Sequence, residues 1–209
     1  MRAMVPGRAV AALVGLTCLM TIEAEAHPHV WISVTEEIVY APDGGVTGLR
    51  QIWTFDDMFS TFATRGLEQK TPGAFTREEL DPLAKIQVDG LKDYAYFMHP
   101  KLDGQQQTDA FAEPMDYFLD FDTKQAALTL HFTLPFKAPM DAKSLEVRIY
   151  DPQLFFYLTF ADDTPVRLID APARCVPRLS SEAQDQAPAG VRTAGMIATA
   201  TRQVWVRCQ

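Results

Sequence analysis

The stretch VWISVTEEIVYAPDGGVTGLRQIWTF, residues 30–55, predicts two β-strands joined by a tight turn. Residues 30–41 alternate apolar with polar side chains and are rich in Val, Ile, Trp and Tyr, which is typical of a half-buried strand. Pro42-Asp43-Gly44-Gly45 predicts the turn, because proline presets φ and glycine accepts positive φ. Residues 46–55 then form the partner strand of a β-hairpin.

The residues before this hairpin have the pattern of an export signal. Arg2 and Arg8 supply positive charge, residues 9–22 are apolar, and Ala24-Glu25-Ala26 fits the small-x-small rule of signal peptidase. The apolar run is too short for a membrane span. We therefore expect a signal peptide over residues 1–26, cleavage after Ala26, and no membrane insertion afterwards.

The composition indicates a globular protein rather than a disordered one. Apolar residues make up 47% of the chain and charged residues 22%. Residues 27–209 suit a single domain. The net charge of −8, without a Lys/Arg stripe, argues against nucleic acid as a partner.

The cysteines predict one disulfide bond. Cys18 lies within the predicted signal, which leaves Cys175 and Cys208 in the mature chain. An even pair in an exported protein favours a bond over two free thiols. Closing that loop is worth roughly 3 kcal/mol in the chain-entropy model.

A helical insertion is predicted at about residues 57–97, after the hairpin. Asp56 or Asp57 can cap a first helix that runs to about Gln69, and Thr76 with Glu79 forms a capping box for a second helix. The apolar side of the first helix is predicted to be Met58, Phe59, Phe62 and Leu67, and that of the second Leu80, Leu83, Ile86 and Leu91.

The strand pattern then returns. Further strands are predicted at residues 115–121, 126–136, 145–150, 154–160, 166–169 and 203–207. Residues 180–201 lack periodicity and predict a long mobile loop. The expected fold class is α+β, mainly β: antiparallel sheets in a sandwich-like arrangement, with one or two helices inserted after the first hairpin.

His27-Pro28-His29 would open the processed chain. The free amine and the imidazole of His27 can chelate one metal ion, an arrangement called a histidine brace. A His at the third position normally indicates a square-planar site that uses backbone amide nitrogens, but Pro28 has no amide proton to lose. In an extended segment His27 and His29 share one face. The pattern predicts a site for a divalent transition metal (Zn, Ni, Co or Cu); the alternative is a polar strand start that binds nothing.

Carboxylates at strand ends are further candidate metal ligands. In an antiparallel hairpin the start of the first strand lies opposite the end of the second, so we expect His29 and Asp56 to approach each other. Asp56 or Asp57 can ligate a metal or cap the helix, and both interpretations stay open. Asp151 is the next candidate ligand, although an Asp before Pro usually organises a turn.

The other histidines and the tryptophans receive structural interpretations. His99 and His131 are expected to be surface or hydrogen-bonded residues. Trp31 and Trp53 are predicted to pack in the core beneath the metal site. No serine lies in a Gly-x-Ser-x-Gly elbow and neither mature cysteine is expected to be free, so we expect no catalytic residues and no enzymatic activity.

Three stretches and the cysteine pair resemble a bacterial family called domain of unknown function 1007. The stretches are His27–Ile32, Trp53–Asp57 with Phe59-Ser60, and Tyr150–Pro152 with its following aromatic run. The resemblance implies location in the periplasm and a role as the periplasmic component of an uncharacterised ABC-type transport system, often beside nickel, cobalt or zinc transporters. It implies no known activity.

The leading hypothesis is a periplasmic accessory protein that binds a divalent transition metal for an inner-membrane transporter subunit. His27 and His29 would be ligands, followed by Asp56 and Asp151. A rival is a non-catalytic structural or partner-binding module of a transporter with no metal site. A small solute-binding protein and a copper oxidase-like enzyme built on the brace are further alternatives.

Overall fold

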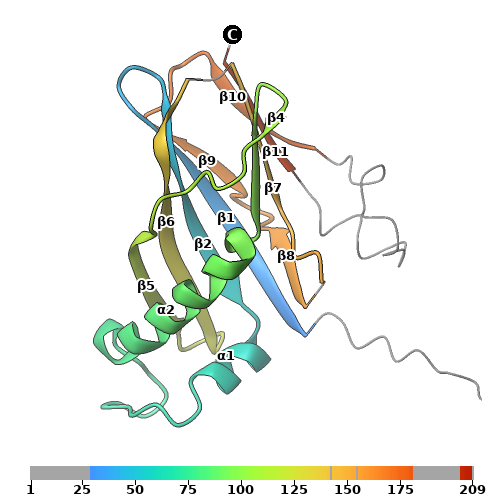
Figure 1. Cartoon of the computed structure of the whole chain (residues 1–209). Helices are drawn as coiled ribbons and strands as arrows, with labels where there is room; N and C mark the ends of the chain where they lie inside the picture. The colour runs from blue at the N-terminus through green and yellow to red at the C-terminus, as the bar shows by residue number, and fades with distance from the viewer. Residues whose placement is uncertain (1–28, 142, 154, 181–202, 209) are drawn as a thin grey trace, which may run out of the picture.

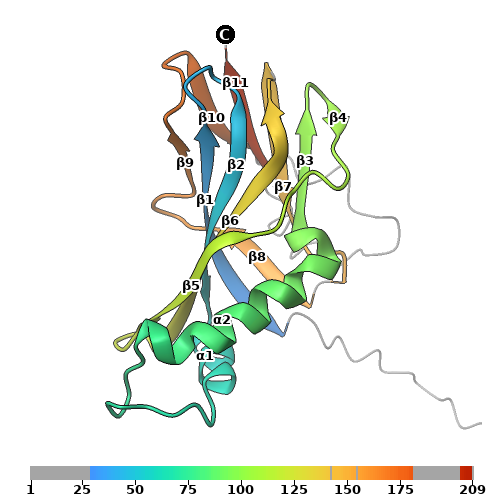
Figure 2. The same cartoon turned by 60° about the vertical axis from the view of Figure 1, so that its left-hand side comes forward.

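The computed structural model describes residues 29–141, 143–153, 155–180 and 203–208. Two β-sheets pack face to face, and the helices gather at one end of the sandwich (Figure 1). In Figures 1 and 2 the second sheet lies toward the end that carries the C-terminus, while α1 and α2 lie toward the opposite end. The predicted fold class, α+β and mainly β with two helices after the first hairpin, is confirmed.

The first sheet is built on the predicted hairpin. Its strand order is β5-β6-β2-β1-β8, with β9 also paired to β1. The strands are β1 (Val30–Tyr40), β2 (Val46–Phe55), β5 (Met115–Asp122), β6 (Ala127–Met140), β8 (Phe156–Phe160) and β9 (Val166–Ile169).

Two pairings in this sheet are parallel, which the sequence analysis did not predict. β8 pairs with the first part of β1 and β9 with the second part, both parallel to it. After β6 the chain leaves the first sheet, forms β7 (Ser144–Ile149) in the second sheet, and returns to the first sheet as β8. A long crossover connection of this kind lets β8 lie parallel to β1. Both short strands thus cover one edge of β1.

The second sheet is antiparallel throughout and has the order β10-β11-β7-β3-β4. Its strands are β3 (Met98–Leu102), β4 (Gln105–Gln106), β7 (Ser144–Ile149), β10 (Cys175–Ser180) and β11 (Gln203–Cys208). Cys175 and Cys208 lie opposite each other in the β10–β11 register and form the predicted disulfide.

The core lies between the sheets and beneath the second helix. Alternate residues of each strand point inward because side chains in a strand alternate between the two faces. From the first sheet these include Ile32, Val34 and Leu49, and from the second Val147 and Val204, all buried. Packing of this kind defines one contiguous core.

The helices are α1 (Asp57–Ala63) and α2 (Arg77–Leu91), followed by the 3₁₀ segment η1 (Lys92–Phe97). The capping box of Thr76 and Glu79 at the start of α2 is confirmed. α1 ends well before the predicted Gln69, because the chain turns after Thr64 and Gly66 takes a positive φ of 84°. None of the helices among the described residues has the length and apolar character needed to cross a bilayer.

The predicted helix faces are partly wrong. Of the four α2 positions, Leu80 is buried and Leu83 and Leu91 pack partly against the core, but Ile86 is 68% exposed. Ala84 and Val88 complete the buried face instead, because α2 lies on β5 along that side.

The predicted apolar side of the first helix is also only half correct. Phe59 packs against the core, as does Leu67 in the segment after the helix, but Met58 and Phe62 are 63% and 74% exposed. A seven-residue helix presents only about two turns, so one row of side chains suffices to anchor it.

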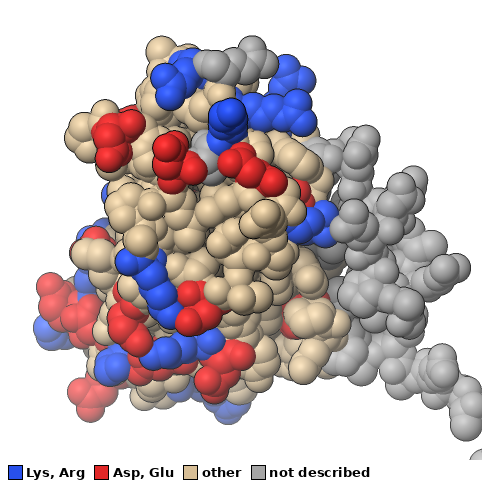
Figure 3. All heavy atoms as spheres, turned by 45° about the horizontal axis from the view of Figure 1, so that its top comes forward, with Lys and Arg blue, Asp and Glu red and all other residues tan. Residues whose placement is uncertain are grey.

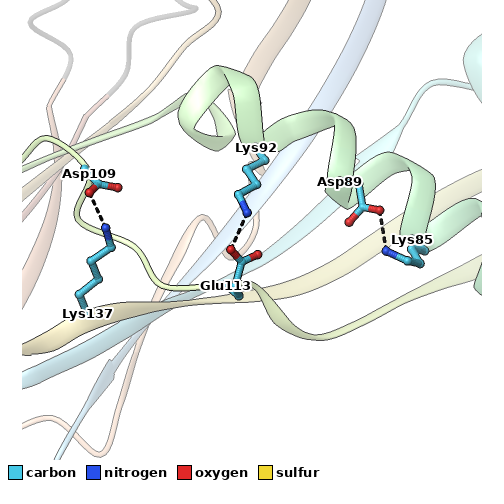
Figure 4. Close-up of polar contacts among 6 residues, drawn as sticks. All are labelled: Lys85, Asp89, Lys92, Asp109, Glu113 and Lys137. Atoms are coloured by element: carbon cyan, nitrogen blue, oxygen red, sulfur yellow. Dashed lines mark hydrogen bonds and ion pairs between the residues drawn. The ribbon is translucent and has the colours of Figure 1, made fainter.

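Exposed charges form several ion pairs around α2 (Figure 4). Lys85 pairs with Asp89 at 2.6 Å within the helix, and Lys92 pairs with Glu113 at 2.5 Å. Lys137 pairs with Asp109. On the face toward the C-terminal end, basic and acidic side chains are intermingled (Figure 3). Exposed pairs of this kind add little stability.

Some predictions lie outside the described residues. The signal peptide over residues 1–26, its cleavage after Ala26, and His27 belong to this group. So does the loop predicted at residues 180–201, apart from Ser180, which ends β10.

Candidate functional site: an aromatic cavity beside His29

Asp56 ties the end of β2 to the start of β1. Its Oδ1 accepts a hydrogen bond from the backbone N–H of Phe59 at 2.7 Å, which caps α1, and its Oδ2 accepts from the backbone N–H of Trp31 at 2.8 Å. Its own backbone N–H donates to the Trp31 carbonyl at 3.0 Å. The two strand ends therefore meet as predicted, and both carboxylate oxygens hold backbone groups. Asp57 is exposed beside it.

Asp151 organises the loop between β7 and β8 in the same manner. Its side chain is buried, with 4% of the residue exposed. Oδ1 accepts from the Gln153 N–H at 2.8 Å, and Oδ2 accepts from the N–H groups of Phe155 and Phe156 at 3.0 Å each. Backbone donors of this kind stabilise a buried carboxylate, so the structure supports the turn-forming interpretation of Asp151.

His29 lies at the edge of this loop. Its backbone N–H donates to the Phe155 carbonyl at 3.0 Å, and its imidazole packs on the Phe155 ring with centroids 5.0 Å apart. The side chain is exposed. Trp31, two residues along the same face of β1, is 42% exposed, so the prediction that it packs in the core is wrong. Trp53, on the opposite face of the sheet, is fully buried as predicted.

A cavity of about 390 Å³ lies beside these elements. β1 and β2 form its floor, α1, α2 and η1 form its walls, and the loop organised by Asp151 closes one side. The lining is strongly aromatic: Trp53, Phe55, Phe59, Tyr94, Phe97, Phe155 and Phe156, with Ile32, Ile86, Gln87, Gly90, Leu91, Asp151 and Gln153.

Gln87 is the unusual group in this lining. Neither its amide nitrogen nor its amide oxygen has a hydrogen-bond partner among the described residues, and both atoms are buried. Its place follows from helix geometry: Gln87 lies four residues after Leu83 and four before Leu91, on the partly buried side of α2. Native proteins rarely leave buried polar atoms unpaired, so this amide calls for an explanation.

A second polar group lies deeper in the core. Glu36 of β1 is fully buried, and neither carboxyl oxygen has a partner among the described residues. Burial raises the pKa of Glu36 from 4.5 to about 8, and the Gln51 amide across the β1–β2 ladder offsets this only in part. Gln51, which lies opposite Glu36 in the β1–β2 register, accepts a hydrogen bond from Trp53 Nε1 at 3.2 Å.

The other histidines lie in different places. His99 stacks on Tyr150 with ring centroids 4.2 Å apart and lines a separate cavity of about 890 Å³. Burial lowers the pKa of His99, and the Nε2 atom has no partner among the described residues. His131 stacks on Phe118 at 4.3 Å, and burial lowers its pKa as well.

No three His, Cys, Asp or Glu side chains within the described ranges come together as a candidate metal centre. Of the four predicted ligands, His29 and Asp56 belong to adjoining strand ends, Asp151 belongs to the loop that holds Phe155, and His27 falls outside the described residues. Asp56 and Asp151 each have a structural role that accounts for both of their oxygens.

Comparison with known families identifies the chain at the level of family. The model of the family described as "Protein of unknown function (DUF1007)" matches residues 12–201, which is most of the chain. The chain belongs to the DUF1007 family. None of the curated proteins matches it.

Each of the three stretches that carried the DUF1007 resemblance contributes to the lining of the cavity. The first contributes Ile32 of β1, the second contributes Trp53, Phe55 and Phe59, and the third contributes Asp151, which fixes the loop before β8. The helical wall, by contrast, was not foreseen as part of a site. The available signal was Gln87, a polar residue in a row of apolar residues at helical spacing.

Proposed function

We propose that this DUF1007 protein is a periplasmic accessory protein of a transition-metal transport system, and that it binds a divalent metal (Zn, Ni, Co or Cu) through His27-Pro28-His29. The observation that carries the proposal is the position of His29. Its backbone N–H donates to the Phe155 carbonyl, and the residue is exposed directly before β1, as the third residue after the predicted cleavage site.

The donor set supports a late first-row metal. After cleavage behind Ala26, His27 would offer its amine and imidazole, and His29 a second imidazole; nitrogen donors of this kind favour Zn, Ni, Co and Cu. Asp56 and Asp151 are weaker candidates for metal ligands than the sequence suggested, because both oxygens of each carboxylate already accept backbone hydrogen bonds. The proposal therefore assigns the metal to the histidines.

The decisive measurement combines processing and affinity. Native mass spectrometry of the exported protein gives its first residue and any bound metal in one spectrum. Calorimetric titration with Zn, Ni, Co and Cu then compares the processed protein with a His27→Ala/His29→Ala variant, for which we expect at least tenfold weaker binding. His131→Ala is the matched control, since that imidazole is engaged with Phe118 on another strand.

A second variant tests the terminal amine. One extra residue placed before His27 keeps both imidazoles but removes the amine chelate, and we expect it to weaken binding as well. Unchanged affinity in the double histidine variant would overturn the metal proposal. In that case the rival interpretation, a partner-binding module without metal, would be tested by capture of the transporter subunit in the presence of a chelator.

A further inference from the structure

We infer that the outward face of the second sheet is a docking surface for an acidic polypeptide segment that also carries apolar side chains. This basic face consists of Lys101 of β3, Arg148 of β7, Trp205 and Arg207 of β11, and Val176 and Arg178 of β10. It lies on the second sheet, whereas the proposed metal ligands precede β1 of the first sheet, so the inference does not depend on the metal proposal.

The strand registers place these side chains on one side of the sheet. Lys101 lies opposite Glu146 in the β3–β7 register. Glu146 lies opposite Trp205, and Trp205 lies opposite Arg178, so one row crosses β3, β7, β11 and β10. Directly opposite residues share a face, as do residues two positions apart on one strand. The residues that alternate with them point the other way and are buried in the core: Leu145, Val147, Val204 and Val206. The row therefore faces away from the core.

The basic face has a surplus of positive charge. Arg178 and Arg207 are exposed, and neither forms an ion pair with any residue that the structure describes. Among the described outward positions of these strands Glu146 is the only carboxylate, and it already pairs with Arg148 at 2.8 Å and with Lys101 at 3.5 Å. This face is therefore basic on a chain whose net charge is −8.

Apolar surface lies among these cations. Trp205 is half-buried, and the guanidinium carbon of Arg207 lies 5.8 Å from the centroid of its ring. Val176, which lies opposite Arg207 in the register, is 53% exposed. An arginine can bind a carboxylate through two parallel hydrogen bonds, while an indole ring offers area for apolar contact. A segment with carboxylates beside apolar side chains matches both features.

The charge of the surrounding surface favours a narrow partner. At about 0.1 M ionic strength exposed charges act over about 10 Å, so a ligand senses mainly the groups that it touches. A nucleic acid or an anionic membrane would extend beyond the basic face and meet the carboxylates of an acidic chain. Asp103 marks this boundary: it accepts a hydrogen bond from the Ser144 N–H at 2.9 Å, and Ser144 lies opposite Arg207. A polypeptide segment, in contrast, can stay on the arginines and on Trp205.

A short synthetic peptide of Glu, Leu and Gly is the probe, and the same peptide with Gln in place of Glu is the matched probe without charge. Calorimetry on the processed protein should show binding of the acidic peptide, and binding of the Gln peptide that is weaker by about tenfold or more. The acidic peptide should also change the tryptophan fluorescence. Trp205→Phe should remove that change, because Trp31 and Trp53 belong to the first sheet.

Charge reversal at two positions locates the site. Arg178→Glu with Arg207→Glu should weaken binding of the acidic peptide by about tenfold or more. Arg65→Glu with Lys124→Glu is the matched control, since both side chains are exposed and the net charge changes by the same amount. Those two residues lie after α1 and between β5 and β6, outside the second sheet, so the control should bind like the wild-type protein. Neither pair of changes touches the histidines, so metal affinity should be unaltered and the two proposals can fail separately.

Three results would overturn the inference. The first is absence of acidic-peptide binding to the wild-type protein. The second is equal peptide affinity in the two charge-reversal variants, since the position of the arginines would then not matter. The third is displacement of the peptide by phosphatidylglycerol vesicles, which would show that a membrane occupies the basic face. If the variant with Arg178→Glu and Arg207→Glu does not fold, as judged by circular dichroism, Arg178→Gln with Arg207→Gln takes its place and the same outcomes decide.

Discussion

The buried carboxyl of Glu36 should make the stability of the fold depend on pH, and Glu36→Gln should remove that dependence. Glu36 lies in β1 with no exposed surface, and neither of its carboxyl oxygens has a partner among the described residues. Glutamine keeps the shape of the side chain but cannot ionise. Folding of the wild-type protein therefore requires Glu36 to keep its proton or to bury a charge.

The size of the effect follows from the pKa. Burial raises the pKa of Glu36 from 4.5 to about 8, so between these values the unfolded chain has released the proton while the folded chain retains it. The unfolded state binds fewer protons, and the free energy of unfolding falls by about 1.4 kcal/mol per pH unit. The stabilising contribution of the proton is complete below pH 4.5 and is lost as the pH rises through about 8. Over the full window the loss amounts to roughly 5 kcal/mol.

Urea unfolding, followed by tryptophan fluorescence, measures this effect. The free energy of unfolding should fall with pH in the wild-type protein relative to Glu36→Gln, and the comparison cancels contributions from His99 and His131, which both proteins share. Glu68→Gln, a change at an exposed carboxylate, is the control and should follow the wild-type curve. Parallel curves for the wild-type protein and Glu36→Gln would refute the reasoning.

Three further predictions concern the scaffold, and urea unfolding checks each of them. Gly48→Ala would place a Cβ atom 2.8 Å from the backbone oxygen of Leu134, which cannot move aside without distorting β6. We therefore expect the free energy of unfolding to fall by about 2 kcal/mol. An unchanged urea midpoint would contradict this close approach. Asp151→Asn exchanges one accepting oxygen for an amino group facing backbone N–H groups, and should cost about 2 kcal/mol. A stable Asp151→Asn variant would show that water replaces these bonds. Cys175→Ser with Cys208→Ser should lower stability by roughly 3 kcal/mol, and equal stability of the wild-type protein with and without reductant would contradict it.

The hairpin and the capping box could be predicted because their determinants are local. Alternation over residues 30–40, the Pro-Asp-Gly-Gly turn and the Thr76–Glu79 box each lie within one short stretch. The parallel pairing of β8 and β9 with β1 could not, since it depends on which distant segment reaches the open edge of β1. β3 and β10 are short and each contains a proline, so their sequences give only a weak strand signal.

Part of the candidate site could also be read from the sequence. The expected approach of β1 and β2 at their ends placed His29 near Asp56, and the hydrogen bond from Trp31 to Asp56 agrees with it. The helical wall of the cavity escaped prediction because it depends on the rotation of α2 over the sheet. That rotation buries the Gln87 amide and leaves Ile86 68% exposed, whereas periodicity alone favoured Ile86 as the buried residue.

The parallel partners of β1 also bear on how the chain folds. Val30 pairs with Phe156, and Val39 pairs with Ile169, so the first strand completes its ladder with segments from the far part of the sequence. Contacts between such distant segments require closure of a long loop before they contribute stability, and they slow folding. The hairpin of β1 and β2 can form early, but one edge of β1 stays unpaired until residues 156–169 have been synthesised. We therefore expect the first sheet to be completed late in the synthesis of the chain.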